Sequence, residues 1–442
     1  MSISPYCLLF ASSAFVAIAS VVSAAKPWTL DRAVAYALAH SPDAQVARAR
    51  VEGAQALVQQ AQSAWFPQLA VSGRYTDTNN PMMAFGSILN QRAFNFGLDF
   101  NHPGQIDNLD AAGTVAYNLY SGGKASASRQ ASRAGAQAAD YDFNAARHEL
   151  AAEVVKSDLN LRKAREALGA IEEGVKAYEA AVSVAQARFD AGQLLKADLL
   201  SLKVQLAQTR ETLSSARHGV ALAERAFDFA LGLNATDSPV DLAPNDPSLA
   251  RLTAPDTQDY SQRSELLGLD ARQRAAEAMV EAARSGHRPS VNAFASYQYD
   301  QGWQLNRGAD SWLAGVSVDL NLFDGGQTSG KVRQASAELA QVKELRRKVE
   351  LGIGLEVEQA RLAHDDAVDR LAVSASAVEQ AEESASLTQA RFQKEALLNA
   401  DLIGAESRLI EARLRRTVAA ADEKLAVVDL RRALGFDPLP QP

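Results

Sequence analysis

The sequence predicts a mainly α-helical protein with a transmembrane β part, built from two copies of one structural unit. Three observations support this fold class: phrases that recur about 203 residues apart, two long stretches without proline, and four runs in which apolar and polar residues alternate. Residues 118–124 read NLYSGGK and residues 321–327 read NLFDGGQ, while Gln-Ala-Arg-Phe stands at both 186–189 and 389–392. Because these phrases recur in the same order, we interpret the chain as an internal duplication.

Residues 1–25 are predicted to be a signal peptide. They contain no Asp, Glu, Lys or Arg, and an apolar run through Val22 is followed by small residues at 23–25. Small residues after such a run are typical of a cleavage site, so we expect an exported protein. The alternative is a transmembrane anchor, which the short and interrupted run disfavours. The one cysteine, Cys7, lies in this segment, so the mature chain is expected to have no thiol.

Each copy is expected to contain a helix, a β-hairpin and two long helices, in that order. The first helix runs from about Thr29 to Ala64, and its counterpart is shorter, from about Ser261 to Ser285. The predicted parts are a first repeat at 26–233 with its hairpin at 68–120 and long helices at 124–232, a linker at 234–260, a second repeat at 261–436 with its hairpin at 290–322 and long helices at 327–435, and a short tail at 437–442.

The long helices need partners along their length. No proline occurs from 104 to 238 or from 290 to 437. Residues Lys124 to Asp190 alone would form a rod of roughly 100 Å at 1.5 Å per residue. We therefore expect the rods to pack side by side, as in a coiled coil or a helical barrel. The helices by themselves fit an exported periplasmic coiled-coil scaffold without a pore equally well.

Four runs of about ten residues have the alternation of a membrane-spanning β-strand with one side toward water. They include Leu69, Val115, Val291 and Trp312, with aromatic residues toward the ends of the runs. A sheet in lipid has to close on itself, and four strands are too few to close, so we expect several chains to combine. The alternative is a pair of soluble β-hairpins that cap a coiled coil.

The two hairpins differ in their connection but end in the same way. The first has 19 residues more than the second, around 79–107, and their richness in Asn, Gly and Pro predicts a loop. After each hairpin we expect a junction where strand becomes long helix, because paired glycines permit the backbone angles that this change requires. These junction residues are Gly122, Gly123, Gly325 and Gly326.

Composition and motifs argue against a chemical active site. The net charge of −8 without a basic patch disfavours nucleic acid as a partner. None of the six histidines has a second His or a Cys at helical ligand spacing, so no metal site is expected. The segment YSGGKAS at 120–126 lacks the first Gly and the final Ser or Thr of a phosphate loop, and no nucleophile elbow or dinucleotide glycine pattern occurs. We therefore expect no enzyme and no cofactor.

Several segments resemble the TolC-type outer-membrane efflux proteins, also called outer membrane factors. They are WTLDRAVAYALAHSPDAQVARARVEGAQ at 28–55, WFPQLAVSGRY at 65–75, both Asn-Leu-x-x-Gly-Gly phrases, ARFDAGQLLKADLL at 187–200 and ALG at 433–435. The resemblance implies a homotrimer whose twelve strands form a β-barrel in the outer membrane of a Gram-negative bacterium, continuous with a periplasmic α-helical barrel and with a collar at 234–260. It also implies a periplasmic adaptor and an inner-membrane pump, proton-driven or of the ABC type. The chain would then be a passive conduit for efflux or type I secretion.

The resemblance also implies that the two helical tips form a periplasmic entrance. Asp198 and Asp401 match positions where the family carries aspartates, which would form an acidic ring. Phe392 and Leu397 replace a Tyr and an Arg of the family's polar latch, so we expect apolar contact to close the gate. The alternative for the aspartates is solvated charge near a helix start, and for the tip leucines it is packing within each hairpin. The residues expected to dock the adaptor are Gly192, Gln193, Leu194, Leu195, Glu395 and Leu398.

Overall fold

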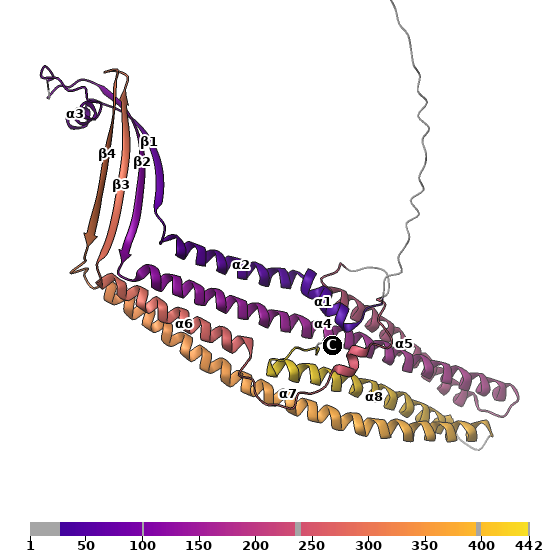
Figure 1. Cartoon of the computed structure of the whole chain (residues 1–442). Coiled ribbons are helices and arrows are strands. Elements are labelled where there is room, and N and C mark those ends of the chain that lie inside the picture. The colour runs from indigo at the N-terminus through magenta and orange to yellow at the C-terminus, as the bar shows by residue number, and fades with distance from the viewer. Residues whose placement is uncertain (1–26, 100, 235–239, 395–398, 441–442) are drawn as a thin grey trace, which may run out of the picture.

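The structure, a computed structural model, is elongated and describes residues 27–99, 101–234, 240–394 and 399–440 (Figure 1). Four strands stand together at one end of the molecule. Long helices extend from them to two hairpin tips at the opposite end. The predicted signal peptide at 1–25 lies outside the described residues.

The two copies contain matching elements in the same order. The first copy consists of α1 (Leu30–His40), α2 (Pro42–Ser63), β1 (Gln68–Thr78), α3 (Pro81–Asn90), β2 (Ile106–Ser121), α4 (Lys124–Asp190) and α5 (Lys196–Leu231). After a short 3₁₀ turn at Pro247–Arg251, the second copy consists of α6 (Ser264–Arg284), a 3₁₀ turn at Ser285–His287, β3 (Ser290–Gly302), β4 (Arg307–Asp319), α7 (Gln327–Gln393) and α8 (Asn399–Leu434). Helices α4 and α7 both have 67 residues, and α5 and α8 both have 36, so the duplication extends to helix length.

The first helical segment is interrupted at Ser41, so the prediction of one helix from about Thr29 to Ala64 was wrong. Ser41 has φ −58° and ψ 138°, which ends α1 and begins α2 at Pro42. A proline disfavours helical geometry in the residue before it and has no N–H to donate to the preceding turn. The Ser41 hydroxyl accepts a hydrogen bond from the Asp43 amide at 3.3 Å, which caps the new helix.

The four strands form one antiparallel sheet in the order β1-β2-β3-β4, so the two hairpins lie side by side. Strand β4 ends at Asp319, before the predicted end of the hairpin at residue 322. The segment around 79–107, predicted as a loop, contains the helix α3, and the prediction was incomplete there. Asn80 caps this helix by accepting from the Met82 and Met83 amides, and Pro81 occupies its first turn.

Helix α4 lies at the centre of the helical part. It packs against α2 and α6 near the sheet and against α5 and α8 toward the tips, while α7 packs against α6 and α8. Consequently α2 and α5 form one margin of the molecule and α7 forms the other, on the same sides as β1 and β4 respectively (Figure 1).

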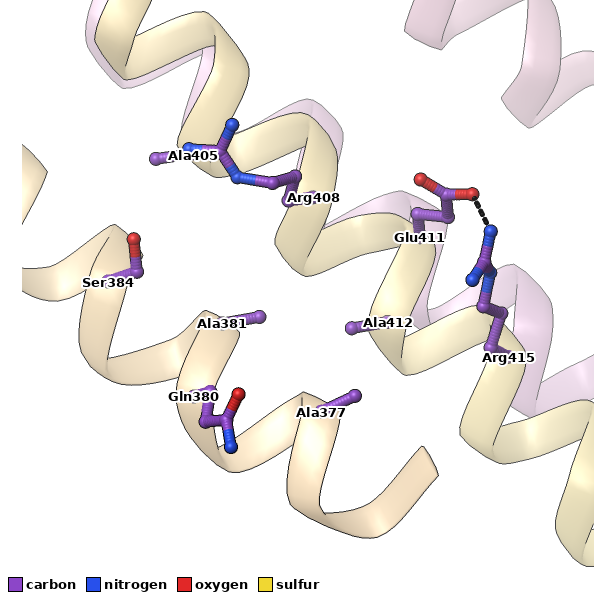
Figure 2. A pocket seen from close by; sticks show the side chains of 9 residues that line it. All are labelled: Ala377, Gln380, Ala381, Ser384, Ala405, Arg408, Glu411, Ala412 and Arg415. Atoms are coloured by element: carbon purple, nitrogen blue, oxygen red, sulfur yellow. Dashed lines mark hydrogen bonds and ion pairs between the residues drawn. The ribbon is translucent and has the colours of Figure 1, made fainter. Parts of the chain in front are cut away.

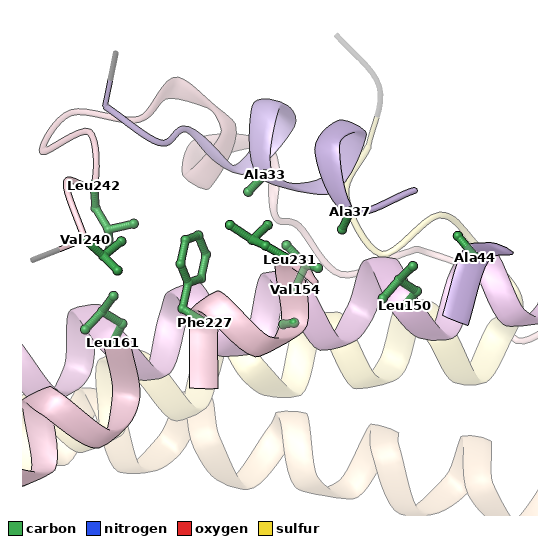
Figure 3. Packing of buried hydrophobic residues seen from close by; sticks show 11 residues of the cluster. Ala33, Ala37, Ala44, Leu150, Val154, Leu161, Phe227, Leu231, Val240 and Leu242 are labelled. Atoms are coloured by element: carbon green, nitrogen blue, oxygen red, sulfur yellow. The ribbon is translucent and has the colours of Figure 1, made fainter. Parts of the chain in front are cut away.

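A large hydrophobic core lies midway along the rods, where α1 and the linker cover α4 and α5 (Figure 3). The Arg162 guanidinium binds the linker there, donating to the Ala243 carbonyl at 2.9 Å and to the buried Asp158 carboxylate at 2.7 Å. Burial raises the pKa of Asp158, and Arg162 partly offsets this effect. The cluster consists of Ala33, Ala37, Ala44, Leu150, Val154, Leu161, Phe227, Ala230, Leu231, Val240 and Leu242.

Candidate functional site

The sheet gathers its apolar side chains on one face. Leu69 lies opposite Val115, and Val115 lies opposite Ala295. Paired residues of antiparallel strands point to the same face, and every second residue along each strand joins them. This apolar face carries Leu69, Val71, Tyr75, Leu109, Val115, Tyr117, Tyr297, Trp312, Val316 and Val318.

The apolar face is uncovered in a single chain. Val71 is 83% exposed, Trp312 is 76% exposed and Val318 is 66% exposed. Soluble monomers rarely leave a contiguous apolar patch of this kind open to water. The face therefore indicates contact with lipid or with another protein.

The opposite face of the sheet is polar. Arg74 lies opposite Asp110, which in turn lies opposite Asp300. Phe294 and Leu313 are apolar exceptions on this face. The Phe294 ring lies over Gly315, where an added Cβ would come within 2.8 Å of it. The other polar side chains of this face include Ser72, Thr76, Asn108, Thr114, Ser296, Gln298 and Ser311.

Both edges of the sheet are unpaired. Within the described chain, β1 pairs only with β2, and β4 pairs only with β3. An edge strand presents a row of free N–H and C=O groups, and these groups need partners wherever water is excluded. The sheet is therefore one segment of a larger strand arrangement if it enters a membrane.

At the end of the sheet that is remote from the helices, the segment containing α3 folds over the polar face. The Gln91 side chain is 1% exposed and its Nε2 donates to the Asp107 carbonyl and to Asn108 Oδ1, both at 2.8 Å. Asn108 in turn donates to Asp300 Oδ1 at 2.6 Å. Ala84, Ile88 and Ile106 form a small apolar core beneath the helix. The segment therefore has a fixed position, although its length has no counterpart in the second copy.

The first strand-to-helix junction needs glycine for two reasons. Gly122 has φ +64° and Gly123 has φ +91°, a region that side chains with a Cβ rarely adopt. A Cβ at Gly122 would also lie 2.8 Å from the Ser285 carbonyl oxygen and 2.9 Å from Arg288 Cβ. The Arg288 guanidinium donates to the Gly122 carbonyl at 3.2 Å, which ties this junction to the start of β3.

The second junction has the same backbone geometry in open surroundings. Gly325 has φ +65° and Gly326 has φ +88°, but no atom lies within 4 Å of a Cβ built at either position. The Asp324 carboxylate accepts from the Gly326 amide at 3.0 Å and from the Thr328 amide at 2.8 Å. The hydrogen bond from the Thr328 hydroxyl, followed by those from the Thr328 and Gly326 amides, lowers the pKa of Asp324, so this side chain caps α7 as an anion.

The tip of the first helical hairpin, formed by α4 and α5, is a tight turn. Gly192 has φ +75°, its amide donates to the Phe189 carbonyl, and the Gln193 amide donates to the Arg188 carbonyl, which is the hydrogen-bond pattern of a Schellman C-cap. Leu194 packs inside the hairpin. Leu195, by contrast, is 73% exposed.

Asp198 lies in the first turn of α5 and is partly exposed, and Asp401 lies exposed in the first turn of α8. Both positions are favourable for an anion, because the amide groups of a helix N-terminus carry partial positive charge. At the tip of the second helical hairpin, formed by α7 and α8, the predicted site residues Glu395, Leu397 and Leu398 lie outside the described residues.

The two tips are joined by a contact that the sequence did not predict. Arg188, in the last turn of α4, donates from Nη2 to the Phe392 carbonyl at 2.6 Å. Its guanidinium carbon lies 4.7 Å from the centre of the Phe392 ring, a cation–π distance. Phe392 is 2% exposed. Within the chain, Phe392 therefore makes a cation–π contact and a hydrogen bond, while the apolar gate at Phe392 and Leu397 stays a prediction. The Ala-Arg-Phe phrase repeated at 187–189 and 390–392 marks the duplication, but it does not indicate that Arg188 and Phe392 meet.

Further from the tips, α8 lies on the first helical hairpin. Tyr178 is fully buried and its hydroxyl lies 3.2 Å from the Ile403 carbonyl and 2.8 Å from Ser407 Oγ. A Cβ added at Gly174 would lie 2.8 Å from Ile410 Cγ1, so α4 and α8 approach closely there. This contact buries the inner face of the first hairpin.

A groove of about 390 Å³ runs between α7 and α8 of the second hairpin (Figure 2). Small side chains form much of its surface, and Arg415 pairs with Glu411 at its rim. No other described element covers it. It is lined by Ala377, Gln380, Ala381, Ser384, Ala405, Arg408, Glu411, Ala412 and Arg415.

The described residues contain no cluster suited to a metal ion: no three His, Cys, Asp or Glu side chains gather at a candidate site. The helices of the described chain also lack the features of membrane spans. Across the described ranges, none is both long enough and apolar enough to cross a bilayer.

Comparison with known proteins relates the whole fold to one family. The family described as outer membrane efflux protein matches residues 33–233 and 260–436, one stretch for each copy. Among curated proteins, Protein CyaE of Bordetella pertussis is 27% identical over 431 residues, which cover 91% of this chain and 83% of that protein.

Solved structures show the same architecture. The outer-membrane channel OprN superposes with a TM-score of 0.77 at 20% identity, over 93% of this chain and 91% of that chain. The outer membrane protein VceC from Vibrio cholerae superposes with a TM-score of 0.76 at 19% identity, over 92% of this chain and 96% of that chain. At these identities the likeness concerns the fold.

Proposed function

Because the chain belongs to the outer membrane efflux protein family, we propose that it is the outer-membrane channel of an export system. The family is one of the outer membrane, and the helices extend from that membrane into the periplasm. In the proposed role the chain is a passive conduit. It takes substrates from an inner-membrane pump and a periplasmic adaptor to the outside, in efflux or in type I secretion.

The main observation that supports this proposal is the sheet, which has one apolar face, one polar face and two unpaired edges within the described chain. Its apolar face suits lipid and its polar face suits a water-filled lumen. Four strands in one chain leave the wall incomplete, so strands of further copies have to pair with β1 and β4. Three copies would supply twelve strands.

The margins of the molecule support a ring. Strand β1 and helix α5 lie on one side and β4 and α7 on the other, so one copy can offer its β4 and α7 to the β1 and α5 of the next. Contacts between two different surfaces of the same chain produce closed rings when the rotation between copies closes. A homotrimer of this kind joins a β-barrel to an α-helical barrel.

In this ring the helical tips form the periplasmic entrance. Asp198 and Asp401 would surround it with six carboxylates in a trimer and favour cations. The exposed Leu195, with Gly192 and Gln193 beside it, offers a surface for the adaptor. Leu194 serves the packing of its own hairpin instead.

Purified mature protein reconstituted in planar bilayers tests the proposal. We expect detergent-dependent solubility, a trimer by light scattering and discrete single-channel conductance. A monomer that is soluble without detergent and gives no conductance would support a periplasmic scaffold and refute the channel.

The same bilayers test the entrance. We expect Asp198→Ala combined with Asp401→Ala to lower the preference for cations and the block by multivalent cations, while Glu211→Ala, an exposed mid-helix control on α5, leaves both unchanged. Unchanged selectivity in the double variant would remove both aspartates from the entrance.

A further inference from the structure

We propose that a cavity between the two helical hairpins binds a short aliphatic diamine. The cavity lies toward the tips and has a volume of about 360 Å³. Its walls come from α4, α7 and α8 of one chain, so the site does not depend on the proposed ring. Carboxylates at both ends and apolar side chains between them are the features that point to this ligand.

The cavity contains a carboxylate without a partner. Glu406 of α8 is 7% exposed, and its side chain lines the cavity. It accepts no hydrogen bond from any residue of the described ranges and forms no ion pair with them. Burial raises the pKa of Glu406, and the charge of Arg413 offsets this only in part. A buried carboxylate is costly unless donors or a cation compensate for its lost hydration, so a ligand that supplies them is favoured here.

The duplication indicates which chemical group suits this position. The equivalent of Glu406 in the first hairpin is Lys203, because the matching helices of the two hairpins begin 203 positions apart. The Lys203 ammonium donates to Gln186 Oε1 at 3.0 Å. The equivalent of Gln186 is Gln389, which lines the same cavity as Glu406. The first copy therefore carries its own ammonium group here, whereas the second copy offers acceptors to an ammonium group from outside the chain.

The other end of the cavity is also acidic. Arg413, two turns further along α8, binds Glu173 Oε2 of α4 and Glu382 Oε1 of α7. The second oxygen of each carboxylate accepts no hydrogen bond from a described residue. Together with Glu406, the lining has three carboxylates and one guanidinium, which gives a charge of −2 when all are ionised. Two positive charges on one ligand would neutralise it.

The middle of the cavity is apolar. Leu409 and Ile410 lie between Glu406 and Arg413 on α8 and line the same cavity. Seven residues of helix separate the two acidic ends by about 10 Å along the axis, so the charges of the ligand have to be separated as well. A single metal ion fits less well, because no three acidic side chains of the described residues gather at one point. A diamine has two separated charges, and its methylene groups can contact Leu409 and Ile410.

A bound diamine would contact both helical hairpins. Glu173 belongs to the first hairpin, whereas Glu382 and Glu406 belong to the second. A ligand that binds only the folded chain raises the free energy of unfolding. Thermal unfolding therefore reports whether the cavity is occupied.

Thermal unfolding of the full mature protein in detergent, with and without 1,4-diaminobutane, tests the site, and calorimetric titration gives the affinity. We expect the diamine to raise the unfolding midpoint. Butylamine has one ammonium group and should raise it less at the same ionic strength. Glu406→Gln keeps the shape of the side chain but removes its charge, so it should weaken diamine binding by on the order of tenfold. The matched control, Glu411→Gln, removes the same charge from an exposed position of α8 outside the cavity and should leave binding unchanged.

Glu406→Lys gives the second hairpin the ammonium group that Lys203 supplies in the first. We expect this variant to fold, as judged by circular dichroism, and to show no shift of its midpoint with the diamine. No shift in the unaltered protein, or a shift of equal size in Glu406→Gln, overturns the proposal. An equal shift with Mg²⁺ that is lost in Glu406→Gln also overturns it, because the site would then bind a metal ion. A shift that is specific to the diamine and is lost in both Glu406 variants supports it.

Discussion

The two helical hairpins have the same helix lengths but different surroundings. The inner face of α4 is buried beneath α8 of the same chain, whereas the equivalent face of α7 is open. The sequence differs where the surroundings differ: Tyr178 fills the covered face, and Ala381 stands at the open one. The backbone of the duplicated unit was thus retained, while side chains at single positions adapted each copy to a different neighbour.

The strand-to-helix junctions show the same relation. Both use two glycines with nearly the same φ angles, but only at the first junction do other parts of the chain approach the glycines, most closely at Gly122. Glycine at 325 and 326 is required by backbone conformation alone. Glycine at 122 is required by conformation and by space.

Removing the Tyr178 ring is expected to have the largest effect. We expect Tyr178→Ala to destabilise the protein by about 3–5 kcal/mol, because a fully buried aromatic ring leaves a cavity. Thermal unfolding followed by circular dichroism in detergent measures this loss. Tyr178→Phe keeps the ring and should lose only about 1 kcal/mol of hydrogen bonding. Equal effects of the two variants would show that the ring does not hold α8 in place.

The junctions are expected to respond unequally to the same change. Gly325→Ala should cost about 1–2 kcal/mol, the strain of a left-handed backbone angle. Gly122→Ala adds a collision with the Ser285 carbonyl and Arg288, which raises the cost by about 1–3 kcal/mol. Unfolding midpoints of the two variants check the difference. A larger loss for Gly325→Ala would contradict the role of packing at Gly122.

The tip contact is expected to affect opening more than stability. We expect Arg188→Ala to remove about 1–2 kcal/mol from the closed arrangement, from the cation–π contact and the hydrogen bond, and to raise the open fraction roughly tenfold. Single-channel recordings measure the open fraction. Arg188→Lys retains the charge but not the planar guanidinium. Its open fraction should therefore lie between that of Arg188→Ala and that of the unaltered protein.

Arg391 is the equivalent of Arg188 in the second repeat, so Arg391→Ala shows whether the second tip makes a similar contact. An effect similar to that of Arg188→Ala is expected if Arg391 has the equivalent partner in the next chain. An unaltered open fraction would restrict the contact to Arg188.

The smallest expected effect concerns Glu406, whose equivalent in the first hairpin is the exposed Lys203. Burial raises the pKa of Glu406, and Arg413 only partly offsets this. Glu173, Tyr178 and Glu382 are the other ionisable groups near it.

A pKa raised on folding means that the folded state binds the proton more tightly. The contribution of Glu406 to stability is therefore greatest below the ordinary pKa of a glutamate, and it falls as the pH rises through the raised value. We expect Glu406→Gln to abolish that fall, as measured by unfolding midpoints across pH 4 to 8. An identical pH profile for the variant and the unaltered protein would exclude Glu406 as its cause.

The duplication made most of the fold predictable. The absence of proline located the long helices, with α4 ending at Asp190 as expected, and the alternation located all four strands. The prediction lacked the interruption at Pro42 and the helix α3, because overall composition does not show where one turn of helix ends or begins. Pro42 and the Asn80-Pro81 pair both mark a helix start, and both were visible in the sequence.

The contacts between hairpins could not be predicted in the same way. Arg188 and Phe392 are 204 positions apart and meet only because α4 and α7 end side by side at the tips. Periodicity assigns a residue to a face of its own helix but does not identify the helix opposite. The proposed effect of Asp198 and Asp401 likewise depends on the other copies, because a ring of carboxylates forms only when several tips meet.

The equal lengths of the paired helices place the tips of both helical hairpins at the same distance from the sheet. A single residue added to α4 would advance its tip by about 1.5 Å and turn everything beyond it by about 100°, while the tip of α7 stayed in place. Successful changes in reach must therefore arise in both halves of the gene, and in matching amounts. The segment at 79–105 has no such twin, so a change in its length needs no matching change in the second copy.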